Sequence, residues 1–239
     1  MSIRNLLAAA AVNYLSTLNV VDVLGDGSCK ALYRFESNLL DTSGTYNGTL
    51  LAGSVTYPTG KFGTSILSSS ARIDTGTKLL MPYNGSYSIS VWFKYEADVR
   101  FSFANRFNAA ITNSYGDTFN TETGKKIQFG KVWHGILTGQ ESEGDRAWLS
   151  IMEYVHNFTV GSFHHLVLSF NRASNIANLY VDGVLVTTKN DFPTANFDSG
   201  QNVYLLSRGD QVYNGTMDHL RFFNRAITQS EVTRLYNEL

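Results

Sequence analysis

Two groups of carboxylates are candidates for acid–base chemistry, because glycoside hydrolysis uses paired carboxyl groups that face one cleft. The denser group is the run that contains Glu141, Glu143 and Asp145. Its serine and glycine neighbours favour a solvated turn over a catalytic pair. Glu96 and Asp98 follow a predicted strand and have no third acid beside them. The sequence therefore predicts a protein that is not an enzyme.

The adjacent histidines His164 and His165 invite a metal-binding or proton-transfer interpretation. They fall in a predicted strand, where neighbouring side chains point to opposite faces, so the two rings cannot converge on one ion. Serine occurs in no nucleophile-elbow sequence, and there is no glycine loop of the kind that cradles phosphate. The single cysteine, Cys29, excludes an intrachain disulfide and is predicted to be a small buried side chain.

Aromatic residues make up 13% of the chain and could form a sugar-binding surface, which needs exposed rings beside hydrogen-bonding groups. Four candidates come from the less regular stretch 97–161, where loops are expected to carry function. These are Tyr115, Trp133, Trp148 and Tyr154. Packing in a core or an interface is the alternative for each. The sequence thus predicts carbohydrate contacts in the middle of the chain.

Composition narrows the class of protein without identifying a partner. The chain has 239 residues, a formal net charge of −1 and only 16% charged residues. We find no basic patch for nucleic acid and no apolar run long enough to span a membrane. A hydrophobic content of 43% fits a β-rich domain, and this length suits one large β-sandwich.

Short strands separated by turn signals are expected along most of the chain. Residues 87–95 alternate in the period-two pattern of a strand, and shorter strands are expected at 65–68 and 71–74. In the less regular stretch 97–161, strands are expected near 101–105, 126–133 and 148–154. Asp182-Gly183 predicts a two-residue hairpin turn between 179–181 and 184–186. This pattern is typical of a Greek-key β-sandwich.

The C-terminal segment predicts a closing strand at 216–223 followed by a capped helix. Thr228 and Glu231 have the spacing of a capping box. Val232, Leu235, Tyr236 and Leu239 then form an apolar stripe, so the helix is expected to pack on the sandwich.

Residues 1–24 are predicted to form a separate helical segment for anchoring or oligomerisation, in front of a β-sandwich domain at 25–239. A signal peptide is disfavoured because Asn13 and Tyr14 interrupt the apolar run. The helix carries a wide uncharged face that must be buried, either on its own sandwich or between molecules. The expected seam residues are Leu7, Ala11, Tyr14, Leu18 and Val21.

Eight short motifs in the same order resemble the laminin-G-like, concanavalin-A-like jelly-roll superfamily. They include 31–35 (ALYRF), 60–63 (GKFG), 88–93 (SISVWF), 179–183 (LYVDG) and 215–218 (GTMD). The resemblance covers residues 30–239. It implies an all-β, two-sheet antiparallel jelly-roll sandwich.

A narrower resemblance lies in residues 23–33 (VLGDGSCKALY) together with 46–49 (YNGT). This phrasing is similar to laminin-G-like domains of tailed-bacteriophage virion proteins. It implies a non-enzymatic virion structural protein, either a head decoration or fibre protein or a tail component. Such a protein would assemble in the host bacterial cytoplasm, contact capsid or tail proteins and self-associate. The alternative is a lectin-like module that binds host-surface glycans.

The resemblance also implies a structural calcium ion, because many relatives hold one at a sheet edge. By position, Asp41 and Asp218 would supply the carboxylates, with Ser43 or Asn47 nearby. Calcium takes several oxygen ligands from turns of this kind. The alternative is an Asx-turn at Asp41 and a structural hydrogen bond at Asp218.

Overall fold

The computed structural model describes residues 20–82, 84–94, 102–104, 114–122, 126–134, 146–155, 158–159, 161–191, 202–208 and 211–238. Of residues 69, 102–104, 114–122, 126–134, 146–151, 153, 207–208 and 211–215 it describes the backbone only. The predicted N-terminal helix lies outside these residues, except for its last few positions.

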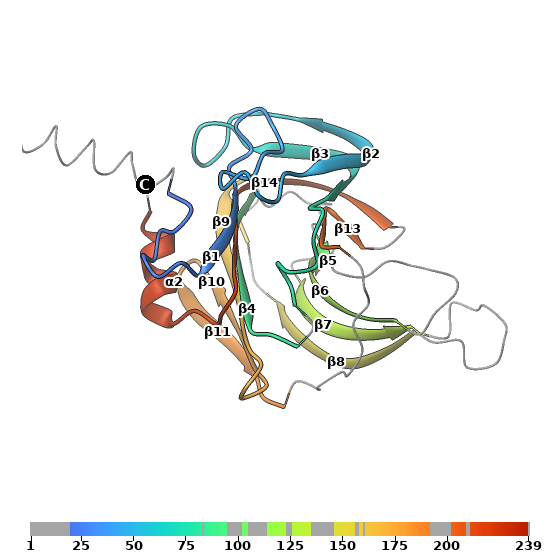
Figure 1. Cartoon of the computed structure of the whole chain (residues 1–239), viewed down its shortest axis with the longest axis vertical. Helices are drawn as coiled ribbons and strands as arrows, with labels where there is room; N and C mark the ends of the chain where they lie inside the picture. Colours follow the sequence, from blue (N-terminus) through green and yellow to red (C-terminus); the bar gives the residue numbers. More distant parts are fainter. Residues whose placement is uncertain are drawn as a thin grey trace, which may run out of the picture.

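The described chain is an antiparallel jelly-roll sandwich with one C-terminal helix (Figure 1). The strands are β1 Cys29–Tyr33, β2 Thr49–Thr56, β3 Ile66–Asp74, β4 Tyr87–Lys94, β5 Ser102–Ala104, β6 Ser114–Glu122, β7 Lys126–His134, β8 Arg146–Val155, β9 Phe163–Asn171, β10 Ile176–Val181, β11 Val184–Lys189, β12 Tyr204–Leu205, β13 Ser207–Arg208 and β14 Gln211–Phe223. The helix is α2, Gln229–Tyr236.

Hydrogen bonding follows the strand order β11-β10-β9-β4-β14-β3-β12-β5-β6-β7-β8. Strands β1 and β13 also pair with β14, and β2 pairs with β3. Strand β14 serves both halves of the sandwich, because its first part pairs with β3 and its second part with β4 and β1. The register shifts after Asp218, where His219 has a φ of 43°. This bulge lets one long strand turn from one sheet into the other.

Strand β4 shows why the sheet is buried on both faces. Ile89, Val91 and Phe93 lie in the main hydrophobic core between the two halves. The intervening side chains, which include Ser90 and Trp92, are also buried, under α2 and the residues around it. The alternation predicted for this strand is therefore confirmed, with a covered outer face instead of a solvated one.

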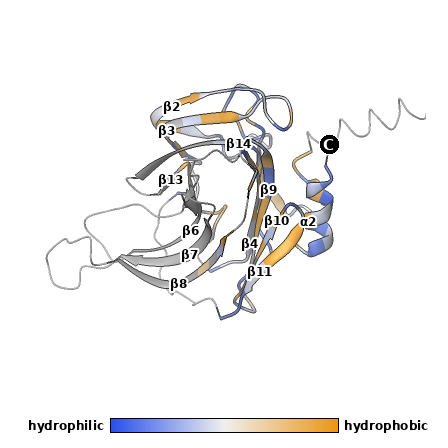
Figure 2. Ribbon diagram, turned by 180° about the vertical axis from the view of Figure 1, so that it is seen from behind, coloured by the Kyte–Doolittle hydropathy of each residue, from blue (hydrophilic) through white to orange (hydrophobic). Residues whose placement is uncertain are grey.

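A second hydrophobic cluster joins the outer face of this sheet to α2. Val232 and Leu235 of the helix pack there with residues that include Val167 and Tyr180. The predicted capping box is present, since Thr228 accepts from the Glu231 backbone and the Glu231 side chain accepts in return. In Figure 2 hydrophobic residues colour β2, β3 and β11, whereas α2 is largely hydrophilic. The helix thus covers the sheet with one narrow stripe.

One expectation about the strands is wrong, because the separate strands predicted at 65–68 and 71–74 are the single strand β3, which continues through Ser70 at a φ of 52°. In the stretch 97–161 the strands expected near 101–105, 126–133 and 148–154 correspond to β5, β7 and β8, whereas β6 is not predicted. No helix within the described ranges is long and apolar enough to cross a membrane.

Candidate functional site

An open hollow of about 350 Å³ lies where the end of α2 meets the β10–β11 turn and the loop between β2 and β3. Its described lining combines aromatic rings with polar groups. The lining residues are Lys61, Trp92, Phe163, His164, Asp182, Tyr236 and Asn237. We call this place the Trp92 hollow.

The aromatic part of the hollow is a stack built from sheet and helix. Trp92 is 4% exposed, and the ring of Tyr236 stacks on it with centroids 5.7 Å apart at 14°. His165 packs on the same tryptophan at 5.0 Å. Tyr236 is 37% exposed, so it offers the aromatic surface that a ligand can reach. Trp92 forms the floor beneath it.

The loop between β2 and β3 places a cation over this floor. The Lys61 ammonium lies 4.6 Å from the centroid of the Trp92 ring, within the range of a cation–π interaction. The neighbouring Phe62 packs edge-on against Trp92, with centroids 5.8 Å apart. Both contacts depend on the path of residues 60–63 across the sheet.

Asp218 holds that loop in place. Its Oδ2 accepts a hydrogen bond of 2.8 Å from the Phe62 backbone N–H, and its Oδ1 accepts one of 2.7 Å from the His219 N–H. A Cβ on Gly60 would lie 2.5 Å from Asp218 Oδ2, so glycine is required for this close approach. The sequence motifs at 60–63 and 215–218 therefore contact each other and together position Lys61.

The polar side of the hollow comes from the β10–β11 turn. Asp182 takes a φ of 47° in the predicted two-residue hairpin turn, which is confirmed. Its Oδ1 accepts from the His165 backbone N–H and its Oδ2 from His164 Nδ1, each at 2.8 Å. His164 Nε2 accepts from the Thr159 N–H at 3.2 Å. Both ring nitrogens of His164 are therefore engaged within the protein.

The two histidines point to opposite faces of the strand, as predicted. His165 faces α2, where its Nε2 is 2.8 Å from the Ser90 hydroxyl. Desolvation, followed by the positive charge of Arg221, lowers the pKa of His165 to about 3. His165 is therefore a neutral part of the layer between sheet and helix. His164 instead packs against Phe93 and Phe158 on the other side.

The two carboxylates proposed for calcium are engaged by the protein itself. Asp41 is 2% exposed, and its oxygens accept from the backbone amides of Leu32, Ser43 and Tyr46. Asp41 also accepts from the Ser43 hydroxyl, and Asn47 Oδ1 accepts from the Asp41 N–H. Among the described residues no group of three acidic, histidine or cysteine side chains could hold a metal.

This donor set does not fit a cation that needs six or more oxygen ligands, because backbone amides already occupy the oxygens of both carboxylates. Asp41 forms an Asx-type turn, and Asp218 makes structural hydrogen bonds, which is the alternative to calcium binding at both residues. Calcium binding stays a prediction for the chain as a whole.

The four aromatic residues predicted to contact sugar lie on strands instead of loops. Tyr115 on β6 is the register partner of Trp133 on β7, and Trp148 on β8 is the partner of Val132. Tyr154, also on β8, is half-buried and packs against the main core. The described lining of the Trp92 hollow contains none of the four.

Of the seam residues and the candidate acid–base carboxylates singled out in the sequence, the structure describes only one. Val21, the last residue of the expected seam, packs with Val23 and Leu24 against the cluster beneath α2. The other seam residues, Leu7, Ala11, Tyr14 and Leu18, lie outside the described residues. So do the carboxylates at 96, 98, 141, 143 and 145.

The site residues Lys61, Trp92, Asp182 and Tyr236 were not recognised as a group from the sequence. Each belongs to a separate motif: the 60–63 loop, a strand, a hairpin turn and a helix stripe. They come together only because the outer face of one sheet carries the helix, the turn and the loop. No spacing along the chain encodes that proximity.

The fold and the hollow define a jelly-roll β-sandwich of lectin-like type. A family model described as the concanavalin A-like lectin/glucanases superfamily matches residues 67–233. The chain belongs to this superfamily, as the resemblance noted in the sequence implied.

Two solved structures illustrate what the fold resembles. Domain 4 of AbnA, an extracellular GH43 arabinanase from Geobacillus stearothermophilus solved in complex with arabinotriose, has a TM-score of 0.59 and 21% identity. That match covers 88% of this chain and 98% of the domain. The binding domain of Paraclostridial Mosquitocidal Protein 1 has a TM-score of 0.58 and 15% identity, over 88% of this chain and 52% of that one. These likenesses show the fold.

One sequence relative is the non-toxic nonhemagglutinin of Paraclostridium bifermentans, which is 24% identical over 152 residues. The match covers 56% of this chain and 12% of that relative. The chain therefore spans only a small part of the length of that protein.

Proposed function

We propose that this chain is a non-catalytic glycan-binding module and that the Trp92 hollow is its binding site. The observation that carries the proposal is the exposed ring of Tyr236 beside polar groups of Lys61 and Asn237. A sugar presents an apolar face of C–H groups and a rim of hydroxyls. An aromatic surface flanked by hydrogen-bonding side chains complements both.

Two further observations support a binding role without catalysis. The arabinanase domain of the same fold was solved with arabinotriose, a short glycan. The described lining of the hollow includes one carboxylate, Asp182, and both of its oxygens accept hydrogen bonds from within the protein. Glycoside hydrolysis of the usual kind needs two carboxyl groups that act on the substrate.

A glycan array followed by calorimetry on the best ligand tests this proposal. Tyr236→Ala should weaken binding by about tenfold or more, since stacking on an exposed aromatic ring is lost. Trp133→Ala and Trp148→Ala serve as comparison variants, because they test the middle strands instead. If those two variants lose binding and Tyr236→Ala does not, the Trp92 hollow is not the site.

The same array settles the calcium prediction when it is run with and without a chelator. We expect binding at the Trp92 hollow to survive chelation, because its described lining supplies no second carboxylate for an ion. Binding that chelator abolishes and added calcium restores would place a cation in the site. Absence of reducing-sugar release from the bound glycan would support the non-catalytic assignment.

We also propose that the module is displayed on a virion, as a head decoration, fibre or tail component. Two features of the sequence favour a location in the virion: the resemblance carried by residues 23–33 and the almost uncharged segment 3–21. Immunogold labelling of purified particles with an antibody against the sandwich would test it. Labelling of the head, of the tail or of neither would give three distinct answers, and the last would contradict the proposal.

A further inference from the structure

We propose that the glycan bound in the Trp92 hollow is acidic, with a carboxylate or sulfate that pairs with the ammonium of Lys61. This inference rests on the proposed glycan-binding function and adds the charge class of the ligand. It follows from the contacts that each charged group of the hollow already makes within the protein.

Lys61 is the cation of the described lining that has no anionic partner. Its ammonium makes cation–π contacts with the rings of Trp92 and Phe62, at 4.6 and 5.9 Å from their centroids. Within the described part of the chain no carboxylate lies within ion-pairing distance of it. Arg225, by contrast, forms an ion pair with Glu231.

The other titratable groups of the lining do not compete for the role of Lys61. Both ring nitrogens of His164 are already engaged, because Nδ1 lies 2.8 Å from Asp182 Oδ2 and Nε2 accepts from the Thr159 amide. The charge of Asp182 is directed inward, toward the His165 amide and the His164 ring. Tyr236 and Asn237 contribute neutral hydrogen-bonding groups. An anionic ligand would therefore meet one free positive charge.

The geometry also lets that charge reach a ligand. Lys61 is exposed, and its loop is fixed through Phe62 and Asp218, so the backbone is held while the long side chain stays able to turn. The cation–π contact keeps the ammonium over the hollow without the strength of an ion pair. A sugar ring on Tyr236 could then present its acidic substituent to Lys61, which would exchange the aromatic contact for a charge-assisted hydrogen bond.

Matched pairs of oligosaccharides test the inference on the full chain. Uronate, sialylated and sulfated oligosaccharides are compared with their methyl-esterified, desialylated and desulfated counterparts, at two ionic strengths. Wild type should bind the acidic member of a pair about tenfold more tightly, and added salt should reduce this preference. Lys61→Gln should remove the preference for the acidic member, and Lys61→Arg should restore it.

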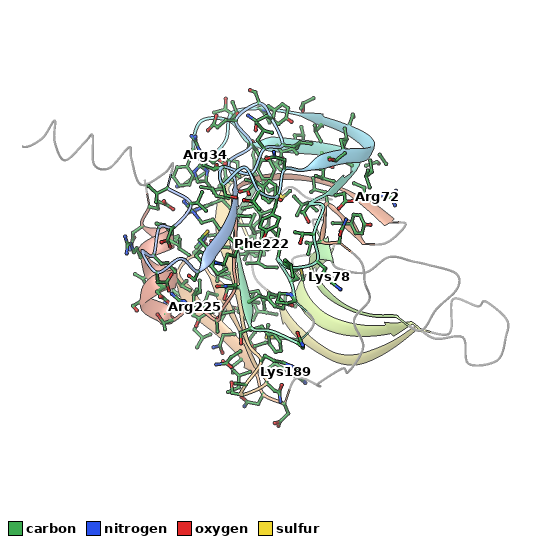
Figure 3. All side chains as sticks on the ribbon, in the orientation of Figure 1. Arg34, Arg72, Lys78, Lys189, Phe222 and Arg225 are labelled. Carbon is green, nitrogen blue, oxygen red and sulfur yellow. The ribbon has the colours of Figure 1, made fainter. Side chains whose placement is uncertain are left out.

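Lys189→Gln is the matched control, because Lys189 lies at the opposite end of β11 from Asp182 (Figure 3). Equal binding of acidic and neutral members by wild type would overturn the inference and leave the glycan-binding proposal standing. So would a preference that persists in Lys61→Gln. Competition by inorganic sulfate as strong as by the acidic sugar would indicate an anion site without sugar recognition. Failure of every member to bind would overturn both proposals.

Discussion

Asp218 has no exposure to solvent and joins two segments that are more than 150 residues apart in the sequence, as the 2.8 Å bond from Phe62 shows. In Asp218→Asn the side-chain amide would face a backbone N–H with one of its own N–H groups. A buried donor left unsatisfied costs about 1–3 kcal/mol, so urea unfolding should show a loss of that size. Glycan binding should weaken as well, because Lys61 loses its support.

Asp191→Asn is the control for that variant, since Asp191 is exposed and asparagine tolerates its φ of 58°. Its free energy of unfolding should change little. An Asp218→Asn protein with wild-type stability and wild-type binding would show that the loop is held by other contacts.

His165 should make the protein sensitive to mild acid. Its pKa is about 3 in the folded protein, below the ordinary value of 6.5, so the fold favours the neutral ring. The stabilisation is fully present above pH 6.5 and is lost as the pH falls toward 3. The slope should reach up to about 1.4 kcal/mol per pH unit within this window. Urea unfolding at pH 7 and pH 5 measures it.

His165→Gln should flatten this dependence between pH 7 and pH 5. Arg225 and Ser28 lower the pKa values of Glu231 and Asp26 to about 2, so these acids lose their favourable charge only at lower pH. An unchanged slope in His165→Gln would assign the acid sensitivity to another group.

At the scale of elements, α2 is fixed to the sheet by a buried ion pair. Arg221 on β14 donates two hydrogen bonds to Glu238, of 2.7 and 2.8 Å, and both side chains are almost fully buried. Glu238→Gln would leave the guanidinium without its counter-charge, at a cost of about 3–5 kcal/mol. Replacing both residues, as Arg221→Met with Glu238→Leu, should recover most of that loss in urea unfolding. A double variant as unstable as the single one would contradict this account.

The contact between α2 and the β10–β11 hairpin can be isolated with two glycines. A Cβ on Gly183, at a φ of 80°, would lie 3.0–3.3 Å from the ring and Cβ of Tyr236. Gly161 has a similar φ of 78° and nothing within 4 Å, so Gly161→Ala measures the backbone strain alone. Gly183→Ala should cost more than this control, and it should also weaken glycan binding because Tyr236 must shift. Equal effects would mean that the ring adapts freely.

Elements whose signal is local could be predicted from the sequence. The Asp182-Gly183 turn, the alternation of β4 and the capping box at Thr228 each depend on a few neighbouring residues, and all three are confirmed. The sequence predicts two strands where the structure has β3, because pairing with β2 and β14 carries one strand through Ser70. Long-range pairing overrode local propensity there.

The candidate site could not be predicted in the same way. Asp218 is predicted as a calcium ligand, but its role in holding residues 60–63 depends on a contact between distant segments. The hollow needs β4, α2, a hairpin turn and a loop to meet on one sheet face. The aromatic residues singled out for sugar contact lie on β6, β7 and β8, in the other half of the sandwich.

At the scale of the whole molecule, the sandwich has two hydrophobic clusters that differ in how they involve the chain ends. The main core lies between the sheets, where Phe222 occupies the centre of the described part (Figure 3). The second cluster joins α2 to Val21, Val23 and Leu24, close to the start of the described chain. Arg225 reinforces this junction by pairing with both Asp26 and Glu231. If the residues before Val21 anchor the protein, the anchor would join the sandwich on the sheet face that carries the Trp92 hollow.

A series of N-terminal deletions can therefore distinguish effects on folding from effects on assembly. Removing residues 1–19 leaves Val21, Val23 and Leu24 in place, so urea unfolding should match that of the full chain. Removing residues 1–24 takes the buried Val23 from the cluster, at a cost of about 1.5–3 kcal/mol. If the seam at Leu7, Ala11, Tyr14 and Leu18 drives self-association, light scattering should show an oligomer for the full chain and a monomer for the shorter deletion. An unchanged oligomeric state after that deletion would move the interface onto the sandwich itself, and the seam would then have no part in assembly.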